Sequence, residues 1–246
     1  MANTRSTPSA SRSRVSSRSK SPSRRSTPSK APKKTSSKVT TQASKGPLFP
    51  HGLYPTVAVT DTVNAAAHYY AAAVCFNADR SEAAWGFLTV AFAATIGVAR
   101  FGFHEHLFAK TNGDLADFAA FVGLPLVGRS FMPSLAPFWS FYPYCAKLTS
   151  FEYIITLCFV EQITRALPKI KDDLKVLPNV LLFVVPVLLS SYQREEWECF
   201  IGMIIFVVSA VVIKPEREKY LFGCRRENLF HWGISIAAAL VARGIP

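Results

Sequence analysis

The positive charge of this 246-residue chain is concentrated at its N-terminal end. Residues 1–46 contain twelve Lys and Arg and no Asp or Glu, whereas the other 200 residues contain sixteen of each sign. That larger part is also strongly apolar, in blocks too long and too closely spaced for the core of a soluble domain. We therefore predict an all-α fold: a polytopic transmembrane helical bundle of about seven spans at 50–246, preceded by a disordered basic Ser/Arg-rich tail at 1–46.

The tail is rich in small polar residues. It contains fourteen Ser and six Thr, with repeated Ser-Arg steps such as Ser11-Arg12-Ser13-Arg14. Because it can bury too little apolar surface to offset its chain entropy, we predict that it is disordered. Its charge favours binding to polyanions, either nucleic acid or the headgroups of acidic lipids. The residues predicted to make these contacts are Arg12, Arg14, Arg18, Lys20, Arg24, Arg25, Lys33 and Lys34.

Two hydroxyl groups of the tail lie in sites typical of proline-directed kinases. Ser21 and Thr27 each precede a proline, and Arg24 or Lys30 lies two positions after that proline. Phosphorylation at either position would cancel up to two positive charges. The tail resembles the arginine–serine segments of splicing factors and of the nucleoplasmic domain of the lamin B receptor. A regulated polyanion-binding role remains open beside a simpler one, in which the charge only fixes membrane orientation.

The composition of the tail also indicates which membrane the chain is targeted to. Residues 1–46 contain no apolar stretch of the kind found in a signal peptide, so we expect no cleavable signal peptide. They are rich in Arg and Ser and lack acids, which is also typical of transit peptides. We therefore predict a membrane of the endoplasmic reticulum or the nuclear envelope, with an organelle membrane reached by a transit peptide as the alternative.

Hydropathy over a window of about 19 residues divides the apolar part into spans. The predicted spans lie near 55–76, 83–100, 116–146, 150–166, 176–192, 197–213 and 228–243. The region 116–146 is long for one helix and contains four prolines, from Pro125 to Pro143, together with Arg129. It is either one kinked helix or two short segments that meet near Arg129 and Ser130.

Loop charge predicts the orientation of the spans. The connections at 165–175 and 214–227 are the most basic, and two spans separate them, so they share one side of the membrane. If 116–146 crosses once, the tail lies on that side too. The positive-inside rule then predicts seven spans, a cytoplasmic N-terminus and a lumenal C-terminus. A second crossing within 116–146 would invert everything that follows it.

Three histidines and one acid are candidate metal ligands. His104, His106, His231 and Asp61 all fall near the cytoplasmic leaflet in this topology. Three imidazoles and a carboxylate at one depth are able to hold zinc and leave a position open for an activated water. Intramembrane hydrolases of the alkaline ceramidase type use a similar set of His and Asp residues. The competing interpretation is that these histidines only meet water and headgroups at the interface.

Charged residues within the spans are costly unless they are paired or hydrated. Asp61 and His68 lie two turns apart on one helix face, as expected of a polar stripe that faces a cavity or a partner helix. Glu161 and Arg165 are spaced for a local ion pair. The stripe, together with the broken region around Arg129, is compatible with a transport pathway.

Three functions follow from these features. The leading hypothesis is a non-enzymatic multi-pass membrane protein whose phosphorylatable tail binds a polyanion or a partner protein on the cytoplasmic or nucleoplasmic side. It requires no cofactor, and its partners are membrane lipids, nucleic acid or acidic headgroups, and a protein within the membrane. The first alternative is a zinc-dependent lipid hydrolase built on His104, His106, His231 and Asp61. The second is a small transporter or channel.

Overall fold

The computed structural model describes residues 54–135, 145, 147–166, 172–215 and 219–245, of which 86% are helical. This confirms a mostly helical fold. The tail predictions, including Ser21, Thr27 and the eight candidate polyanion-binding residues, lie outside the described residues. So do Pro137 and Pro143 of the region 116–146.

Continuous helices follow one another with short connections in the described part of the chain. They are α1 (Pro55–Asn77), α2 (Ser81–Gly102), α3–η1–α4 (Glu105–Phe118, Ala119–Gly123, Leu124–Arg129), α6 (Ser150–Ala166), α7–η3–α8 (Asp172–Asn179, Val180–Val184, Val185–Gln193), α9–η4 (Trp197–Val208, Ser209–Ile213) and α10 (Arg226–Arg243). A 3-10 turn, η2 (Met132–Leu135), follows α4, and a small antiparallel hairpin of β1 (Tyr220–Leu221) and β2 (Cys224–Arg225) precedes α10.

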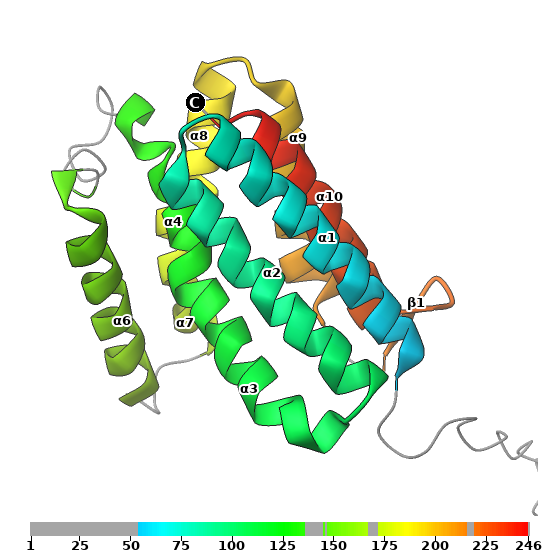
Figure 1. Ribbon diagram of the computed structural model, residues 1–246. Helices are drawn as coiled ribbons and strands as arrows, with labels where there is room; N and C mark the ends of the chain where they lie inside the picture. The colour runs from blue at the N-terminus through cyan, green and yellow to red at the C-terminus, as the bar shows by residue number, and fades with distance from the viewer. Residues whose placement is uncertain (1–53, 136–144, 146, 167–171, 216–218, 246) are drawn as a thin grey trace, which may run out of the picture. The chain divides into compact units, whose positions relative to one another are not determined.

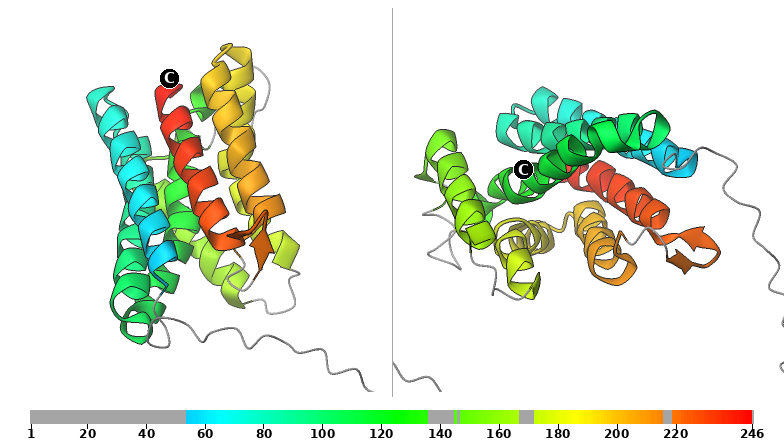
Figure 2. Two further views of the ribbon diagram at one scale, coloured as in Figure 1. Left: turned by 90° about the vertical axis from the view of Figure 1, so that its right-hand side faces the viewer. Right: turned by 90° about the horizontal axis from the view of Figure 1, so that it is seen from below.

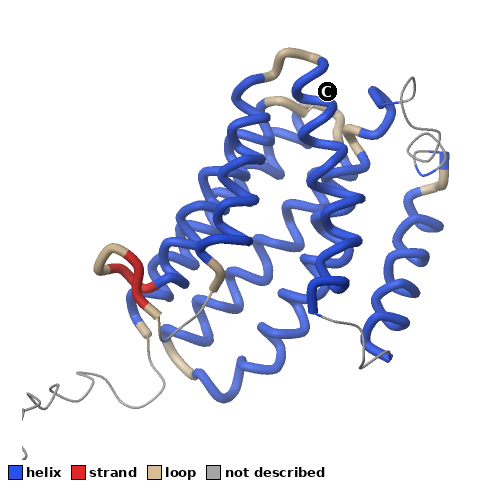
Figure 3. The backbone as a smooth tube through the Cα atoms, turned by 180° about the vertical axis from the view of Figure 1, so that it is seen from behind, coloured by secondary structure: helices blue, strands red, loops and turns tan. Residues whose placement is uncertain are grey.

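Successive helices alternate in direction, so each begins at the end of the bundle where its predecessor ends (Figure 1). Seen along the bundle, α1, α2 and α3 form one layer, and α8, α9 and α10 form a second layer that faces it (Figure 2). The first helix packs on both α2 and α10. The hairpin lies at the end where α1 begins (Figure 3).

Length and composition make two of the described helices candidates for crossing a membrane: Ser81–Gly102 and Val176–Gln193. Trp197–Ile213 is apolar but shorter.

The region predicted at 116–146 contains one helix that begins earlier, at Glu105, and continues to Arg129. Its first turns were missed because they carry charged and exposed residues rather than an apolar run. Pro125 does not break this helix, because it follows directly on the π-helical segment η1. The same arrangement recurs where Pro186 follows η3. A π turn shifts the hydrogen-bonding register by one residue, which accommodates a proline ring that an unbroken α-helix would exclude.

Close helix contacts depend on glycine. A methyl group at Gly128 of α4 would overlap the carbonyl oxygen of Leu182 and lie 2.7 Å from the Cα of Phe183. Only a glycine therefore lets α4 approach the backbone of η3 this closely. Gly113 of α3, by contrast, has open space where its side chain would be.

Substitution by alanine is expected to change the free energy of unfolding in opposite directions at these two glycines. Gly128→Ala forces α4 away from η3 and should lower the free energy of unfolding by about 1–3 kcal/mol. Gly113→Ala adds a helix-favouring residue without a clash and should raise it by about 1 kcal/mol. Thermal unfolding of the purified full chain in detergent compares the two variants. A Gly128→Ala protein as stable as the wild type would show that this close contact does not exist.

Candidate functional site

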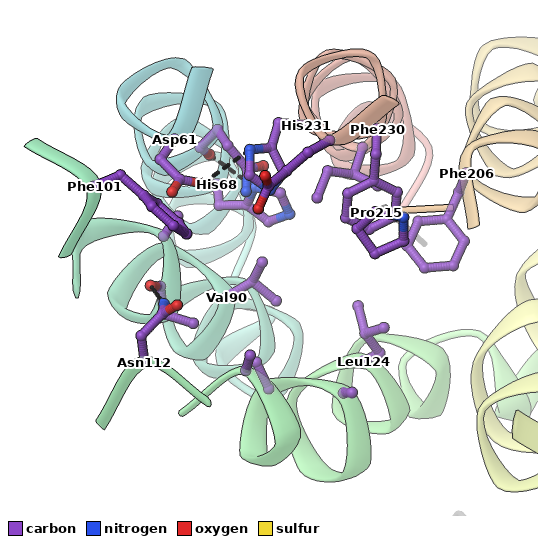
Figure 4. Close-up of a pocket in the computed structure, with 18 residues that line it drawn as sticks. Asp61, His68, Val90, Phe101, Asn112, Leu124, Phe206, Pro215, Phe230 and His231 are labelled. Atoms are coloured by element: carbon purple, nitrogen blue, oxygen red, sulfur yellow. Dashed lines mark hydrogen bonds and ion pairs between the residues drawn. The ribbon is translucent and has the colours of Figure 1, made fainter. Parts of the chain in front are cut away.

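A cavity of about 290 Å³ lies within the bundle, near the end where α1 and α10 begin. Its walls come from α1, α2, the α3–η1–α4 helix, α9 and α10 (Figure 4). Asp61 lies in the second turn of α1, Phe101 near the end of α2, and Glu227 in the first turn of α10. Val90 and Leu124 line the cavity further from these helix ends. The cavity therefore extends from one end of the bundle into its interior.

The polar face of α1 forms part of this cavity. Asp61, Asn64 and His68 recur at helical spacing, and all three are buried and line the cavity. The predicted Asp61–His68 stripe thus faces inward. Val59 and Tyr70, on other faces of the same helix, are exposed. The polar positions of α1 therefore face the interior of the bundle, together with small apolar residues of the same helix.

Asp61 and His231 join the first helix to the last. Oδ1 of Asp61 lies 3.0 Å from Nδ1 of His231, and both side chains are largely buried. An ionised carboxylate only accepts hydrogen bonds, so Nδ1–H of His231 donates and Nε2 is left as the second polar atom of the ring. Thr60 Oγ1 lies 3.3 Å from the same Nδ1. On the other side of Asp61, a side chain at Gly97 would overlap Oδ2, so a glycine in α2 leaves the room that the carboxylate occupies.

Further hydrogen bonds connect α1 and α10 beside this pair. The hydroxyl of Ser235 lies 3.3 Å from Oδ1 of Asn64 and donates to the carbonyl oxygen of His231 at 2.6 Å. Nδ1 of His68 lies 2.9 Å from the carbonyl oxygen of Asn64, to which it donates. The bond from Nδ1 orients the ring of His68 at the cavity wall, and the contact between Ser235 and Asn64 joins α10 to α1.

The predicted zinc ligands do not form one group. Asp61 and His231 are in contact, but His104 precedes α3 and His106 lies in its first turn, and both are exposed. In the part of the chain that the structure describes, no three His, Cys, Asp or Glu side chains are grouped so as to hold a metal ion. The helix α3 begins at Glu105 and has no buried residue, so its first turn lies on the surface of the bundle.

The other charged residues expected within spans lie away from the cavity. Nη1 of Arg129 is 3.1 Å from Oε1 of Glu82, and its guanidinium also contacts the ring of Tyr153 and the carbonyl oxygen of Leu148. Arg129 therefore joins α2, α4 and the beginning of α6 instead of lining a pathway. Glu161 is buried, and the side chain of its expected partner Arg165 lies outside the described residues.

Sequence reasoning missed Glu227 and Asn112 as cavity residues. Glu227 lies in the basic connection 214–227, where the sequence predicts only a charged loop residue. Asn112 lies in the polar stretch between the predicted spans 83–100 and 116–146. Only the early start of α3 and the start of α10 at Arg226 place both at the cavity.

Comparison with protein-family models, curated proteins and solved structures found no match to this chain.

The contact between Asp61 and His231 predicts strong coupling in a double-mutant cycle. With Asp61→Asn, His231→Gln and the double variant, we expect a coupling free energy of about 1–3 kcal/mol, because the pair is buried. The matched control is Arg243–Glu198, which has a similar 3.4 Å separation but side chains that are more than half exposed. Its coupling should be below about 1 kcal/mol. Equal coupling in the two cycles, read from unfolding in detergent, would contradict the assignment.

Proposed function

We propose that this chain is a multi-pass integral membrane protein of the endoplasmic reticulum or nuclear envelope, with seven crossings. The observation that carries the proposal is the apolar outer surface of the bundle, which occurs together with charged groups buried inside. Large apolar side chains are exposed along the described helices, whereas Asp61, His68 and Glu227 are buried beside the apolar core. In water, exposed apolar side chains and buried charged groups are both unfavourable. In a lipid bilayer, the apolar side chains contact lipid and the charged groups are kept away from it.

Helix α6 shows the outward face most clearly. Phe151, Ile155, Phe159 and Ile163 recur every four residues and are 72%, 51%, 65% and 43% exposed. This spacing places them on one side of the helix as a continuous apolar stripe. The second such face, on α9–η4, is formed by Ile201, Ile204, Val208, Val211 and Val212. Apolar surface of this extent on a monomer is typical of contact with lipid or with another protein.

The lengths of the helices fit a bilayer. They run from 17 residues in α6 to 25 in the continuous α3–η1–α4 helix, or about 25–38 Å at 1.5 Å per residue, against a hydrocarbon thickness of about 30 Å. The mean hydropathy of α1 and α10 is lowered by polar residues that face the cavity and would not contact lipid. The helix α9–η4 is apolar but is shorter than the two candidate spans.

The ends of the bundle differ in charge, which supports the orientation. The start of α1, the hairpin and the start of α7 lie at one end (Figure 1). The connections 165–175 and 214–227, which join helices at that end, contain nine Lys and Arg in the sequence. The connections and chain end at the opposite end carry Arg80, Lys147, Arg194 and Arg243. With the tail added to the first end, the positive-inside rule places that end in the cytoplasm or nucleoplasm.

The tail supplies the second part of the proposal. Its twelve positive charges, without any acid, favour attachment to nucleic acid, to acidic headgroups or to an acidic partner protein on that side of the membrane. The support for this part comes from the sequence alone.

Seven crossings predict opposite fates for tags at the two ends of the chain. In sealed microsomes, added protease should remove an N-terminal tag and leave a C-terminal tag protected, because an odd number of crossings places the ends on opposite sides. Detergent-opened microsomes, in which both tags should be digested, are the control. Digestion of both tags in intact vesicles would show an even number of crossings.

The tail predicts a charge switch. A peptide of residues 1–46 should lose affinity for acidic liposomes and for RNA when phosphorylated at Ser21 and Thr27, because up to four positive charges are cancelled. At about 1 kcal/mol per charge near an anionic surface, the loss should reach at most about a thousandfold. Binding of the unmodified peptide should also weaken steeply between low and physiological salt. Equal binding by both forms would leave the tail as an orientation signal only.

A further inference from the structure

The short hairpin before α10 has an exposed aromatic side chain at its tip. Tyr220 pairs with Arg225 and Leu221 pairs with Cys224, so the turn consists of two residues. These residues are Phe222 and Gly223, and both have a positive φ, +52° and +78°. Such angles are typical of the two-residue turns that match the twist of a hairpin. Phe222 is 92% exposed, so the turn holds a large apolar ring away from the rest of the described chain.

This position is unfavourable for phenylalanine in water in two respects. A left-handed backbone is strained for a bulky side chain, and the residue that such a turn prefers before glycine is asparagine or aspartate. The ring of Phe222 also exposes apolar surface to the solvent. No side chain in the described part of the chain covers this ring. An apolar environment outside the chain would offset both costs.

The base of the hairpin is tied to three helices. The backbone N–H of Arg226 donates to the carbonyl oxygen of Lys219 at 3.0 Å, and its guanidinium donates to the carbonyl oxygen of Val212 at 2.5 Å. The guanidinium of Arg225 lies over the ring of Tyr54, 4.9 Å from its centre. These contacts connect the hairpin with the end of η4 and with the starts of α1 and α10. The bundle therefore sets the direction in which the tip points.

That direction is sideways. In Figure 1 the hairpin projects from the side of the bundle near the start of α1, and the beginning of α3 lies further toward that end. The view along the bundle shows the hairpin at its rim, outside the helices (Figure 2). If the bundle crosses a bilayer, a segment in this position lies along the membrane surface and not in the water beyond it.

The side chains around the hairpin are of the types that concentrate at membrane surfaces. A groove between the hairpin and the first turns of α1 and α10 is lined by Tyr220, Asn228 and Trp232, among others. Tyr220 and Trp232 are both exposed. Each combines an apolar ring with a polar atom, and such side chains are enriched where hydrocarbon meets water.

Basic side chains complement the phosphate groups of such a surface. Lys214 at the end of η4 and Lys219 at the base of the hairpin are exposed, and Arg225 and Arg226 are partly buried. Glu227, which follows them, is buried in the bundle. The described outer surface beside the hairpin is therefore basic as well as aromatic. Phospholipid, with a phosphate above an acyl chain, matches both properties.

We propose that the hairpin Tyr220–Arg225 anchors the start of α10 in the phospholipid headgroup layer, with the ring of Phe222 inserted as far as the acyl chains. This inference rests on the proposed membrane crossing, because it needs a bilayer surface at this end of the bundle. Lys214 and Lys219 contact phosphate groups, and Tyr220 and Trp232 lie at the level of the headgroups. Insertion removes the ring from water, which offsets the strain of its turn.

A spin label at Cys224 reports the depth of the hairpin. Cys224 is exposed, whereas Cys75, Cys145 and Cys199 are buried, and the partly exposed Cys158 is replaced by alanine. The labelled full chain is placed in nanodiscs of phosphatidylcholine and phosphatidylserine, without any other protein. Collisions of the label with a water-soluble nickel chelate are then compared with its collisions with dissolved oxygen.

The water-exposed control carries the label at His104→Cys, with Cys224 replaced by serine. His104 is exposed and lies between α2 and α3 at the same end of the bundle. We expect the Cys224 label to collide with the nickel chelate at least about threefold less often than this control, because a group at the boundary of headgroups and acyl chains is shielded from a polar reagent.

Phe222→Asn separates anchoring from the folding of the hairpin. It removes the apolar ring but introduces the residue that this turn prefers before glycine, so the unfolding temperature should not fall. The Cys224 label should then collide with the nickel chelate as often as the control. Leu107→Asn removes another exposed apolar side chain, in α3, and should leave the protection of the label unchanged. If Phe222→Asn fails to fold, Phe222→Gly decides, because glycine also accepts a positive φ.

The outcomes distinguish the anchor from the membrane crossing on which it rests. Equal collision rates at Cys224 and at the control would overturn the anchor, leave the crossing in place and favour a protein partner for this surface. Protection that persists in the folded Phe222→Asn variant would overturn the role of the ring. A chain that does not enter nanodiscs would overturn both the crossing and the anchor.

Discussion

The contact between Asp61 and His231 closes the bundle, because it joins the first helix to the last through residues that are 170 positions apart in the sequence. A buried carboxylate is costly in a low-dielectric interior unless a partner offsets its charge. His231 supplies that partner, and Gly97 supplies the space beside it. The layer of α1 and α2 and the layer of α9 and α10 are therefore held together at a polar contact, with Ser235 and Asn64 adding to it. The cavity lies directly beside this contact and owes its polar wall to it.

Packing elsewhere combines small residues, which allow close helix contacts, with larger buried apolar side chains. The main core contains Ala71, Ala72, Ala83 and Ala84 as fully buried residues, together with a few Val and Phe. Small side chains allow close helix approach where lipid competes equally for apolar surface, so that van der Waals contact and polar bonds must hold the helices together. Arg129 and Glu82 form a second such polar contact at the opposite end of the bundle. The two contacts fasten the bundle at its two ends.

Backbone geometry allows two helices to continue through a proline, although the sequence pattern alone predicts a break there. Pro125 and Pro186 lie within long helices, where a proline ring would collide with the preceding turn. In both cases a π segment of five residues ends immediately before the proline-containing helix. The wider turn changes the register of the hydrogen bonds and lets the helix continue in nearly the same direction. One continuous helix therefore covers the region 116–146 as far as Arg129.

The sequence by itself determined that the chain is mostly helical and where most helices lie, because hydrophobic periodicity and helix-breaking residues act locally. The predicted ranges 150–166 and 197–213 coincide with α6 and α9–η4 for this reason. It also indicated that Asp61 and His68 share a face, since helical spacing alone decides that. Only the tertiary structure decided that this face meets His231 and Glu227, and that His104 and His106 do not join them. Which side chains converge depends on the rotation and packing of helices far apart in the chain. Local spacing carries no information about that rotation, so a set of residues of the right type predicted a zinc site where the packing of the described helices forms a cavity with two carboxylates instead.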